Sequence, residues 1–181
     1  MVKAQALPVP KKARVLLIDD DSGVLNVTQR VLERAGHEVV ACSSGDDALV
    51  SLARETFDVM ISDIQMPGVT GLTLLRAVRD HDLDLPVVLV TGNPGVKSAA
   101  DAVEYGAFRY LIKPLHNAEF KGVILQAIAI GRAARSKREY AEEFGKKRFG
   151  VGIVPGWMRF WIALWPAFGW PINPSFVLLI S

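Results

Sequence analysis

The amino-acid sequence predicts an α/β fold, a doubly wound parallel sheet of five strands with helices on both faces. Five short apolar runs alternate with five segments of helical periodicity, and the connections between them are short. The apolar runs are mostly continuous rather than alternating, which is typical of strands that are covered on both faces. Right-handed crossovers are then expected in every strand–helix–strand unit.

Each predicted strand is a short apolar run that ends at a polar or turn-forming residue. The first run ends at Asp19, and the third ends at Asp63, shortly before Met66-Pro67-Gly68. Proline cannot donate a hydrogen bond to a sheet and glycine permits a turn, so the third strand is expected to stop there. The five predicted strands cover residues 14–18, 38–42, 58–62, 86–90 and 108–112.

The predicted helices carry an amphipathic pattern between recognisable start and stop signals. Asp21 or Ser22 is a good N-cap for the first helix, and Gly36 is a good residue to end it. The next three helices are expected at about 46–54, 71–79 and 96–105. The last helix should begin near residue 117, run past residue 135 towards residue 144, and end by Gly145.

Composition limits the classes of function. A chain of 181 residues has room for one domain with a sizeable core and an appendage, and its net charge of +2 is too small to indicate nucleic-acid binding. Residues 131–149 hold seven basic and three acidic side chains, a charge of +4, which leaves −2 for the remainder. The single Cys42 excludes an intramolecular disulfide and is expected to be an inert buried thiol in a reducing compartment.

Side chains with useful chemistry stand at the ends of four predicted strands: Asp19 and Asp20, Asp63, Thr91, and Lys113. In a parallel sheet these groups converge if the four strands are neighbours. Three carboxylates would repel one another unless a cation lay among them, and oxygen ligands without histidine or cysteine suit Mg²⁺. A lysine and a threonine hydroxyl can hold phosphate oxygens, so the set is suited to phosphoryl transfer.

These motifs resemble the signature of the receiver domain of two-component response regulators. The matching segments are Ile18-Asp19-Asp20-Asp21, Ser62-Asp63 with Met66-Pro67-Gly68, Val90-Thr91-Gly92, and Lys113-Pro114. The resemblance covers residues 13–135 and implies a flavodoxin-like sheet in the order 2-1-3-4-5. It also implies a phosphorelay protein of the cytoplasm that takes its phosphoryl group from a sensor histidine kinase. Its only catalysis would be its own phosphorylation and dephosphorylation.

The resemblance assigns a role to each site residue. Asp63 would be the phosphorylated aspartate, and Mg²⁺ would be held by Asp19, Asp20, Asp63 and the backbone carbonyl of Gln65. Thr91 would donate a hydrogen bond to the phosphoryl group, Lys113 would pair with it, and Tyr110 would be the aromatic side chain that swings inward. Taken alone, these three residues would be a turn residue, a solvated strand end and a core side chain. Asp21 and Ser22 are expected to cap a helix rather than to bind metal.

The same resemblance carries expectations for output and for the lifetime of the phosphoryl group. The surface formed by the fourth helix, fifth strand and fifth helix would change and contact a partner or a second copy of the chain. The residues two positions after Asp63 and Thr91, which are Gln65 and Asn93, are both amides. Neither adds a general base, so the phosphorylated form is expected to be long-lived.

Other phosphate-binding classes fit less well. A dinucleotide- or flavin-binding protein would need a glycine-rich turn after the first strand, where this chain has three aspartates. A phosphatase of the haloacid-dehalogenase kind has Asp-x-Asp at its nucleophile, whereas Gln65 stands two residues after Asp63. No helix-turn-helix is recognisable, so a transcription factor is not predicted.

The two ends of the chain differ from the centre. Residues 1–12 lack an apolar run long enough for a signal peptide and are expected to form a mobile leader. Residues 136–149 are expected to form a charged helical linker. The tail at 150–181 contains all four tryptophans, with Trp157, Trp161 and Trp165 on one helical stripe, and prolines interrupt it too soon for a span of about 20 residues.

Three interpretations of the tail stay open. It can be an interfacial anchor that makes the protein a membrane-associated adaptor, since tryptophan is favoured at membrane interfaces. It can instead be a packing surface for a partner. The third interpretation is a truncated multidomain regulator that has lost its output domain.

Overall fold

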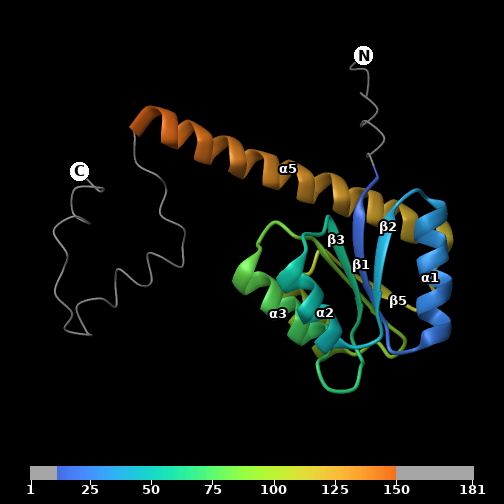
Figure 1. The fold of residues 1–181 in the computed structure, drawn as a ribbon. Coiled ribbons are helices and arrows are strands. Elements are labelled where there is room, and N and C mark those ends of the chain that lie inside the picture. Colours follow the sequence, from blue (N-terminus) through green and yellow to red (C-terminus); the bar gives the residue numbers. More distant parts are fainter. Residues whose placement is uncertain (1–11, 150–181) are drawn as a thin grey trace, which may run out of the picture. The chain divides into compact units, whose positions relative to one another are not determined.

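The computed structural model describes residues 12–149, which form a parallel five-stranded sheet flanked by helices (Figure 1). The sheet order is β2-β1-β3-β4-β5, and every neighbouring pair is parallel. The strands are β1 Arg14–Ile18, β2 Glu38–Cys42, β3 Val59–Asp63, β4 Val87–Thr91 and β5 Arg109–Ile112. The helices are α1 Ser22–Arg34, α2 Gly45–Arg54, α3 Gly71–His81, α4 Val96–Glu104 and α5 Asn117–Phe149. The predicted doubly wound fold and its strand order are confirmed.

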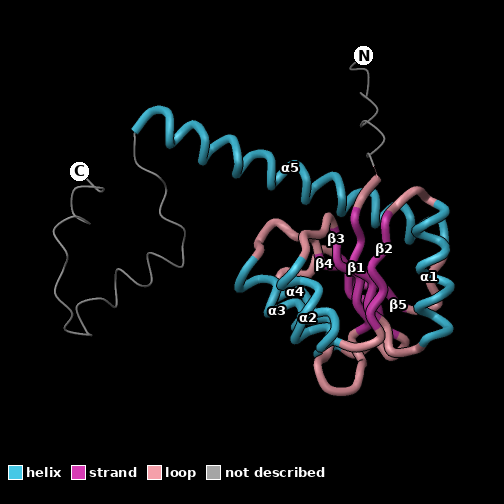
Figure 2. Tube along the Cα trace, viewed as in Figure 1, coloured by secondary structure: helices cyan, strands magenta, loops and turns pink. Residues whose placement is uncertain are grey.

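The sheet is covered on both faces, so apolar residues that alternate along each strand enter two different cores. Figure 2 shows α2, α3 and α4 together on one face of the sheet. Leu16, Met60 and Leu89 pack in one core with residues of these helices, among them Ala48, Leu74 and Ala102. Their neighbours Leu17, Ile61 and Val88 pack with residues of α1 and the first half of α5, among them Leu32, Phe120, Ile124 and Ile128. Burial on both faces explains why these strands are continuously apolar in the sequence.

The chain divides into two units inside α5, between Ala134 and Arg135. The first unit contains the sheet, α1 to α4 and the first half of α5. In the described part of the chain, the second unit consists of the rest of α5, where the rings of Tyr140 and Phe144 stack with centroids 6.3 Å apart.

The prediction that the last helix ends by Gly145 was wrong, because α5 continues to Phe149. A single glycine inside a helix costs only about 1 kcal/mol and can be tolerated when its neighbours favour the helix. Other element boundaries differ from the predicted ones by one or two residues. Asp63 and Thr91, for example, are the last residues of their strands rather than the residues that follow them.

Residues 1–11 of the leader predicted at 1–12, and the tail at 150–181 with its tryptophan stripe, lie outside the described residues. Within residues 12–149, no helix is both long and apolar enough to cross a membrane.

Candidate functional site

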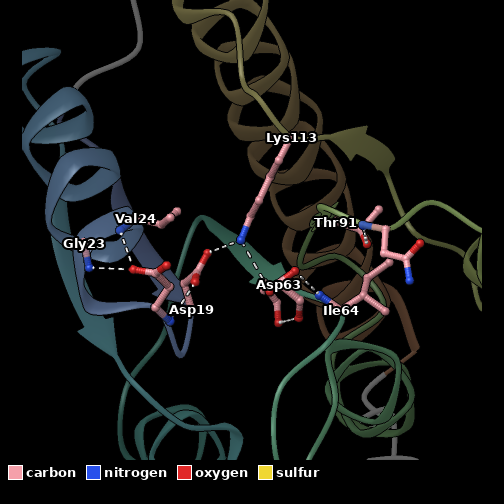
Figure 3. A network of polar contacts seen from close by, with 10 residues as sticks. Asp19, Gly23, Val24, Asp63, Ile64, Thr91 and Lys113 are labelled. Atoms are coloured by element: carbon pink, nitrogen blue, oxygen red, sulfur yellow. Dashed lines mark hydrogen bonds and ion pairs between the residues drawn. The ribbon is translucent and has the colours of Figure 1, made fainter.

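Four strands bring polar side chains to the carboxyl edge of the sheet (Figure 3). Asp19 follows β1, Asp63 ends β3, Thr91 ends β4, and Lys113 follows β5. Asp19, Asp63 and Thr91 are buried, with exposed fractions of 5%, 8% and 1%. Because β1, β3, β4 and β5 are adjacent in the sheet, these side chains are brought to one edge, although they lie far apart in the sequence.

Lys113 reaches across the edge and contacts two carboxylates. Its Nζ lies 2.7 Å from Oδ2 of Asp19 and 3.3 Å from Oδ2 of Asp63. Burial alone would lower the pKa of Lys113, but its hydrogen bonds and charge interactions with Asp19 and Asp63 raise that pKa above the ordinary lysine value. The lysine is therefore a firmly held cation between two acids.

The two oxygens of Asp63 have different environments. Oδ1 accepts a hydrogen bond from the backbone N–H of Ile64 at 2.8 Å, and Oδ2 faces Lys113. The backbone carbonyl of Asp63 accepts a hydrogen bond from the Ser62 hydroxyl at 2.8 Å. These bonds fix the orientation of the carboxylate within a fully buried strand end.

Gly71, the first residue of α3, allows that helix to pack directly on the strand end. A methyl group at Gly71 would lie 2.2 Å from the carbonyl oxygen of Asp63, closer than atoms can approach without a shift. Gly71 also donates its N–H to the carbonyl of Ile64 at 3.2 Å. Gly68, in the turn before α3, has φ +73°, a left-handed conformation that favours glycine.

Three carboxylates gather at this edge. The ligand oxygens of Asp19, Asp20 and Asp63 all lie within 4.8 Å of one another. Asp20 is exposed, whereas Asp19 is buried and accepts a hydrogen bond from the N–H of Asp21 at 3.0 Å. Burial raises the pKa of Asp19 above its ordinary value, against the opposing effects of Lys113 and the Asp21 N–H.

This donor set fits a divalent cation. Three carboxylates and one lysine leave a local charge of −2, which a doubly charged ion would neutralise. All of the acidic groups are hard oxygen ligands, the type that Mg²⁺ prefers, and the exposure of Asp20 leaves room for water ligands.

Asp21 has a different role from Asp19 and Asp20. Its side chain accepts hydrogen bonds from the N–H groups of Gly23 at 2.8 Å and Val24 at 3.1 Å, which makes it the N-cap of α1. The prediction that Asp21 caps a helix is confirmed.

Three predicted residues are not part of the group of carboxylates. The Thr91 hydroxyl accepts a hydrogen bond from the N–H of Asn93 at 3.1 Å, in the loop that leads to α4. The hydroxyl of Tyr110, on β5, lies 3.0 Å from Oγ of Ser98 on α4. Gln65, with an exposed side chain, follows Ile64 in the loop after β3.

The contacts of Ser62, Gly71 and Ser98 were not predicted from the sequence. Gly71 carried a usable signal, since it is a glycine at the start of a predicted helix shortly after the acidic strand end. The contacts of Ser62 and Ser98 depend on hydroxyl directions that no spacing rule predicts. The peptide bond between Lys113 and Pro114 is cis, which was also not predicted.

Comparison with known proteins gives a consistent result. The family model of the response regulator receiver domain matches residues 15–125. The chain is 43% identical over 102 residues to the response regulator protein FleR of Pseudomonas aeruginosa, covering 56% of this chain and 22% of FleR. It is 37% identical over 115 residues to the DNA-binding transcriptional regulator NtrC of Salmonella typhimurium, covering 64% of this chain and 24% of NtrC. The chain thus spans about a quarter of each relative.

The fold comparison agrees with the sequence comparison. A crystal structure of a response regulator receiver domain protein from Clostridium thermocellum is similar to this chain with a TM-score of 0.64 and 31% identity. The match covers 67% of this chain and 98% of that one.

Proposed function

The chain belongs to the response regulator receiver family of two-component systems, and we propose that it accepts a phosphoryl group on Asp63 from a sensor histidine kinase. The observation that carries this proposal is the environment of Asp63. Its carboxylate ends a buried strand, lies 3.3 Å from Lys113 and shares the edge with two further carboxylates within 4.8 Å. A carboxylate held in this way can attack phosphorus without the entropy loss of first being oriented.

The transfer forms one bond and breaks one. A carboxylate oxygen of Asp63 attacks the phosphorus of a phosphohistidine, the new O–P bond forms, and the N–P bond breaks with its electron pair going to the imidazole. Lys113 can exchange its ion pair with the Asp63 carboxylate for one with the phosphoryl oxygens, because its Nζ already lies between Asp19 and Asp63. The Thr91 hydroxyl, whose oxygen accepts the Asn93 N–H, can donate its own proton to the phosphoryl group.

We assign the magnesium ligands to Asp20, Asp63 and the backbone carbonyl of Gln65, with Asp19 beside them. Asp19 already accepts from Lys113 through Oδ2 and from the Asp21 N–H through Oδ1, so it suits a supporting position. When bound, Mg²⁺ would neutralise the charge that three carboxylates and a phosphoryl group bring together.

The output surface proposed for this chain is formed by α4, β5 and α5. Apolar side chains on it are exposed, among them Val96 at 91%, Val103 at 78% and Ile112 at 54%. Movement of Thr91 and Tyr110 on phosphorylation would change this surface and so its contact with a partner or a second copy of the chain.

Phosphorylation can be tested without the cognate kinase. The chain, incubated with acetyl phosphate and Mg²⁺ and examined by intact mass, should gain one phosphoryl group, and Asp63→Asn should abolish the gain. Asp21→Asn is the matched control, because asparagine caps a helix about as well as aspartate and the side chain of Asp21 is held by the N–H groups of Gly23 and Val24. No gain in the native chain would overturn the proposal, as would an equal gain in Asp63→Asn.

The same assay measures the lifetime of the phosphorylated form. Because Gln65 and Asn93 offer amides rather than a general base, we expect the phosphoryl group to persist well beyond seconds after acetyl phosphate is removed. Loss within seconds would contradict this expectation. Continuous release of phosphate from a phosphomonoester, with no stable adduct, would instead indicate a phosphatase.

A further inference from the structure

The two ends of α4 are held in different ways. At the C-terminal end, Arg76 on α3 donates a hydrogen bond to the hydroxyl of Tyr105, and its guanidinium lies 3.9 Å from the centre of the Tyr105 ring. Arg79 on the same helix donates to the carbonyl of Gly106 at 3.1 Å and to that of Leu85 at 2.9 Å. Two arginines of α3 therefore fasten this end to the rest of the sheet unit.

The N-terminal end has a weaker attachment. Among residues 12–149, one hydrogen bond joins the first turn of α4 to another element, the contact of 3.0 Å between Ser98 and Tyr110 of β5. Val96 at the same end is 91% exposed, whereas Ala102 in the second half of the helix is fully buried. Among the described residues, a single pair of hydroxyls thus supplies the hydrogen bonding between the first turn and another element.

Counting protons shows which hydroxyl is the donor. A serine hydroxyl has one proton and two lone pairs. Ser98 donates its proton to the carbonyl of Gly95 at 2.9 Å and accepts from the N–H of Gly95 at 3.3 Å. Its remaining lone pair must therefore accept the proton of the Tyr110 hydroxyl. The bond depends on Tyr110 keeping its present position and on Ser98 staying folded over the helix start.

The loop from β4 connects this bond to the acidic cluster. The Thr91 hydroxyl accepts the N–H of Asn93, and Gly95, the N-cap of α4, follows two residues later. If Thr91 turns to a phosphoryl group on Asp63, the hydrogen bond to Asn93 draws the loop with it. Gly95 and Ser98 move together because they share two hydrogen bonds.

We propose that Ser98 is a positioning residue whose hydrogen bond to Tyr110 holds the first turn of α4, so that the helix pivots about its arginine-fastened C-terminal end when the bond is released. The inference rests on the function proposed for Thr91 and Tyr110. Ser98 then sets how often the unphosphorylated chain visits the released state.

Amide hydrogen exchange in the unphosphorylated full chain, resolved by residue with NMR, tests the bond. Tyr110→Phe removes only the hydroxyl and should raise exchange at Ala99, whose N–H makes the first helical bond of α4, by roughly two- to tenfold. Tyr105→Phe is the matched control at the other end. It should raise exchange at Gly106 and Ala107 and leave Ala99 unchanged.

Ser98 variants complete the test. Ser98→Ala should raise exchange at Ala99 at least as much as Tyr110→Phe does, and the double variant should add nothing further. Ser98→Thr keeps the hydroxyl and should restore the native rate. Unchanged exchange at Ala99 in Tyr110→Phe would overturn the inference, as would a uniform increase along all of α4.

A functional readout separates positioning from simple loss of structure. If the released state is the one that accepts phosphate, Ser98→Ala should be phosphorylated by acetyl phosphate roughly two- to tenfold faster than the native chain, and Ser98→Thr should not. A slower Ser98→Ala chain would contradict the inference. If the native chain takes up no phosphate, the proposed function fails, while the exchange experiment still decides whether the bond holds α4.

Discussion

The two ends of strand β3 carry aspartates in opposite circumstances. Asp58, just before the strand, has both oxygens occupied: Arg132 donates to them at 3.0 and 2.9 Å, and the N–H of Arg14 donates at 2.9 Å. Asp63, at the other end, shares a single lysine with Asp19 and lies beside Asp20. At the amino edge of the sheet, where the strands begin, Asp58 and Arg132 form a neutral pair. At the carboxyl edge, three carboxylates share one lysine.

The difference separates a structural carboxylate from a reactive one. At the amino edge, the hydrogen bonds to Asp58 raise the pKa of Arg132, since the ion pair favours its charged form. At the carboxyl edge, burial raises the pKa of Asp19, so the protein holds negative charge there at a cost. An excess of one charge sign, fixed by the backbone, indicates a site that binds an ion or a charged group.

Substitution of Gly71 should distort the carboxyl edge through a steric clash, without any change of charge. Gly71→Ala places a methyl group 2.2 Å from the carbonyl oxygen of Asp63 and 2.9 Å from Oγ of Ser62. Because both lie in a fully buried strand end, the chain must shift, and we expect a loss of about 3 kcal/mol in the free energy of unfolding. Urea denaturation measures the loss, and phosphorylation by acetyl phosphate should fall with it.

Gly122 in α5 provides the control for Gly71. A methyl group there would meet nothing within 4 Å, and the residue lies in a helix. Gly122→Ala should therefore stabilise the chain by up to about 1 kcal/mol. If Gly71→Ala were also stabilising, close backbone packing at the site would not be the reason for glycine.

Removal of one charge from the amino edge should be destabilising. Asp58→Asn keeps the shape but removes the negative charge from the pair with Arg132, in which the side chains of Asp58 and Arg132 are 15% and 32% exposed. We expect a loss of about 2 kcal/mol, below the value for a fully buried pair because solvent reaches the arginine. Glu55→Gln, in an exposed pair with Arg14, should cost less than about 0.5 kcal/mol. Equal losses in Asp58→Asn and Glu55→Gln would show that the buried pair contributes no more to stability than the exposed one.

The same kind of substitution at the carboxyl edge should have the opposite sign. Asp20→Asn removes one of three crowded carboxylates, so without divalent cations it should stabilise the chain by about 0.5–1 kcal/mol. Mg²⁺ at ten times its dissociation constant should stabilise the native chain by about 1.4 kcal/mol and stabilise Asp20→Asn much less. Thermal unfolding with EDTA and with Mg²⁺ measures both effects. If Asp20→Asn were less stable than the native chain in EDTA, the three carboxylates would not be repelling one another as proposed.

Much of the carboxyl edge could be predicted from the sequence because it depends on local patterns. Asp19, Asp63, Thr91 and Lys113 each follow or end an apolar run, and parallel strands bring such ends together. The strand order came from the resemblance to receiver domains, since short apolar runs do not reveal which strands are neighbours.

The amino edge could not be predicted in this way. Asp58 and Arg132 are separated by 74 residues, and their pairing depends on how α5 rotates as it packs on the sheet. The bond between Ser98 and Tyr110 depends likewise on the placement of α4 on β5. Gly145 shows the reverse case, in which a strong local stop signal was overridden by the surrounding helix.

His37 should give the smallest of these effects, a dependence of the free energy of unfolding on pH that arises at the amino edge. The residue is 8% exposed at the amino edge, and burial, with a further contribution from the charge of Arg132, lowers its pKa below the ordinary value of 6.5, against the opposing effect of Asp58. As pH falls through 6.5, the unfolded chain takes up a proton before the folded chain does. The free energy of unfolding should therefore fall with decreasing pH, by at most about 1.4 kcal/mol per pH unit.

Urea denaturation between pH 7 and pH 5 should show this slope in the native chain and a flatter curve in His37→Phe, which cannot be protonated. The carboxyl edge should contribute in the other direction at lower pH, because the raised pKa of Asp19 means that protonation there favours the folded chain. A slope that persists in His37→Phe would place the acid sensitivity outside the amino edge, and the two edges would then not differ in the way their charges indicate.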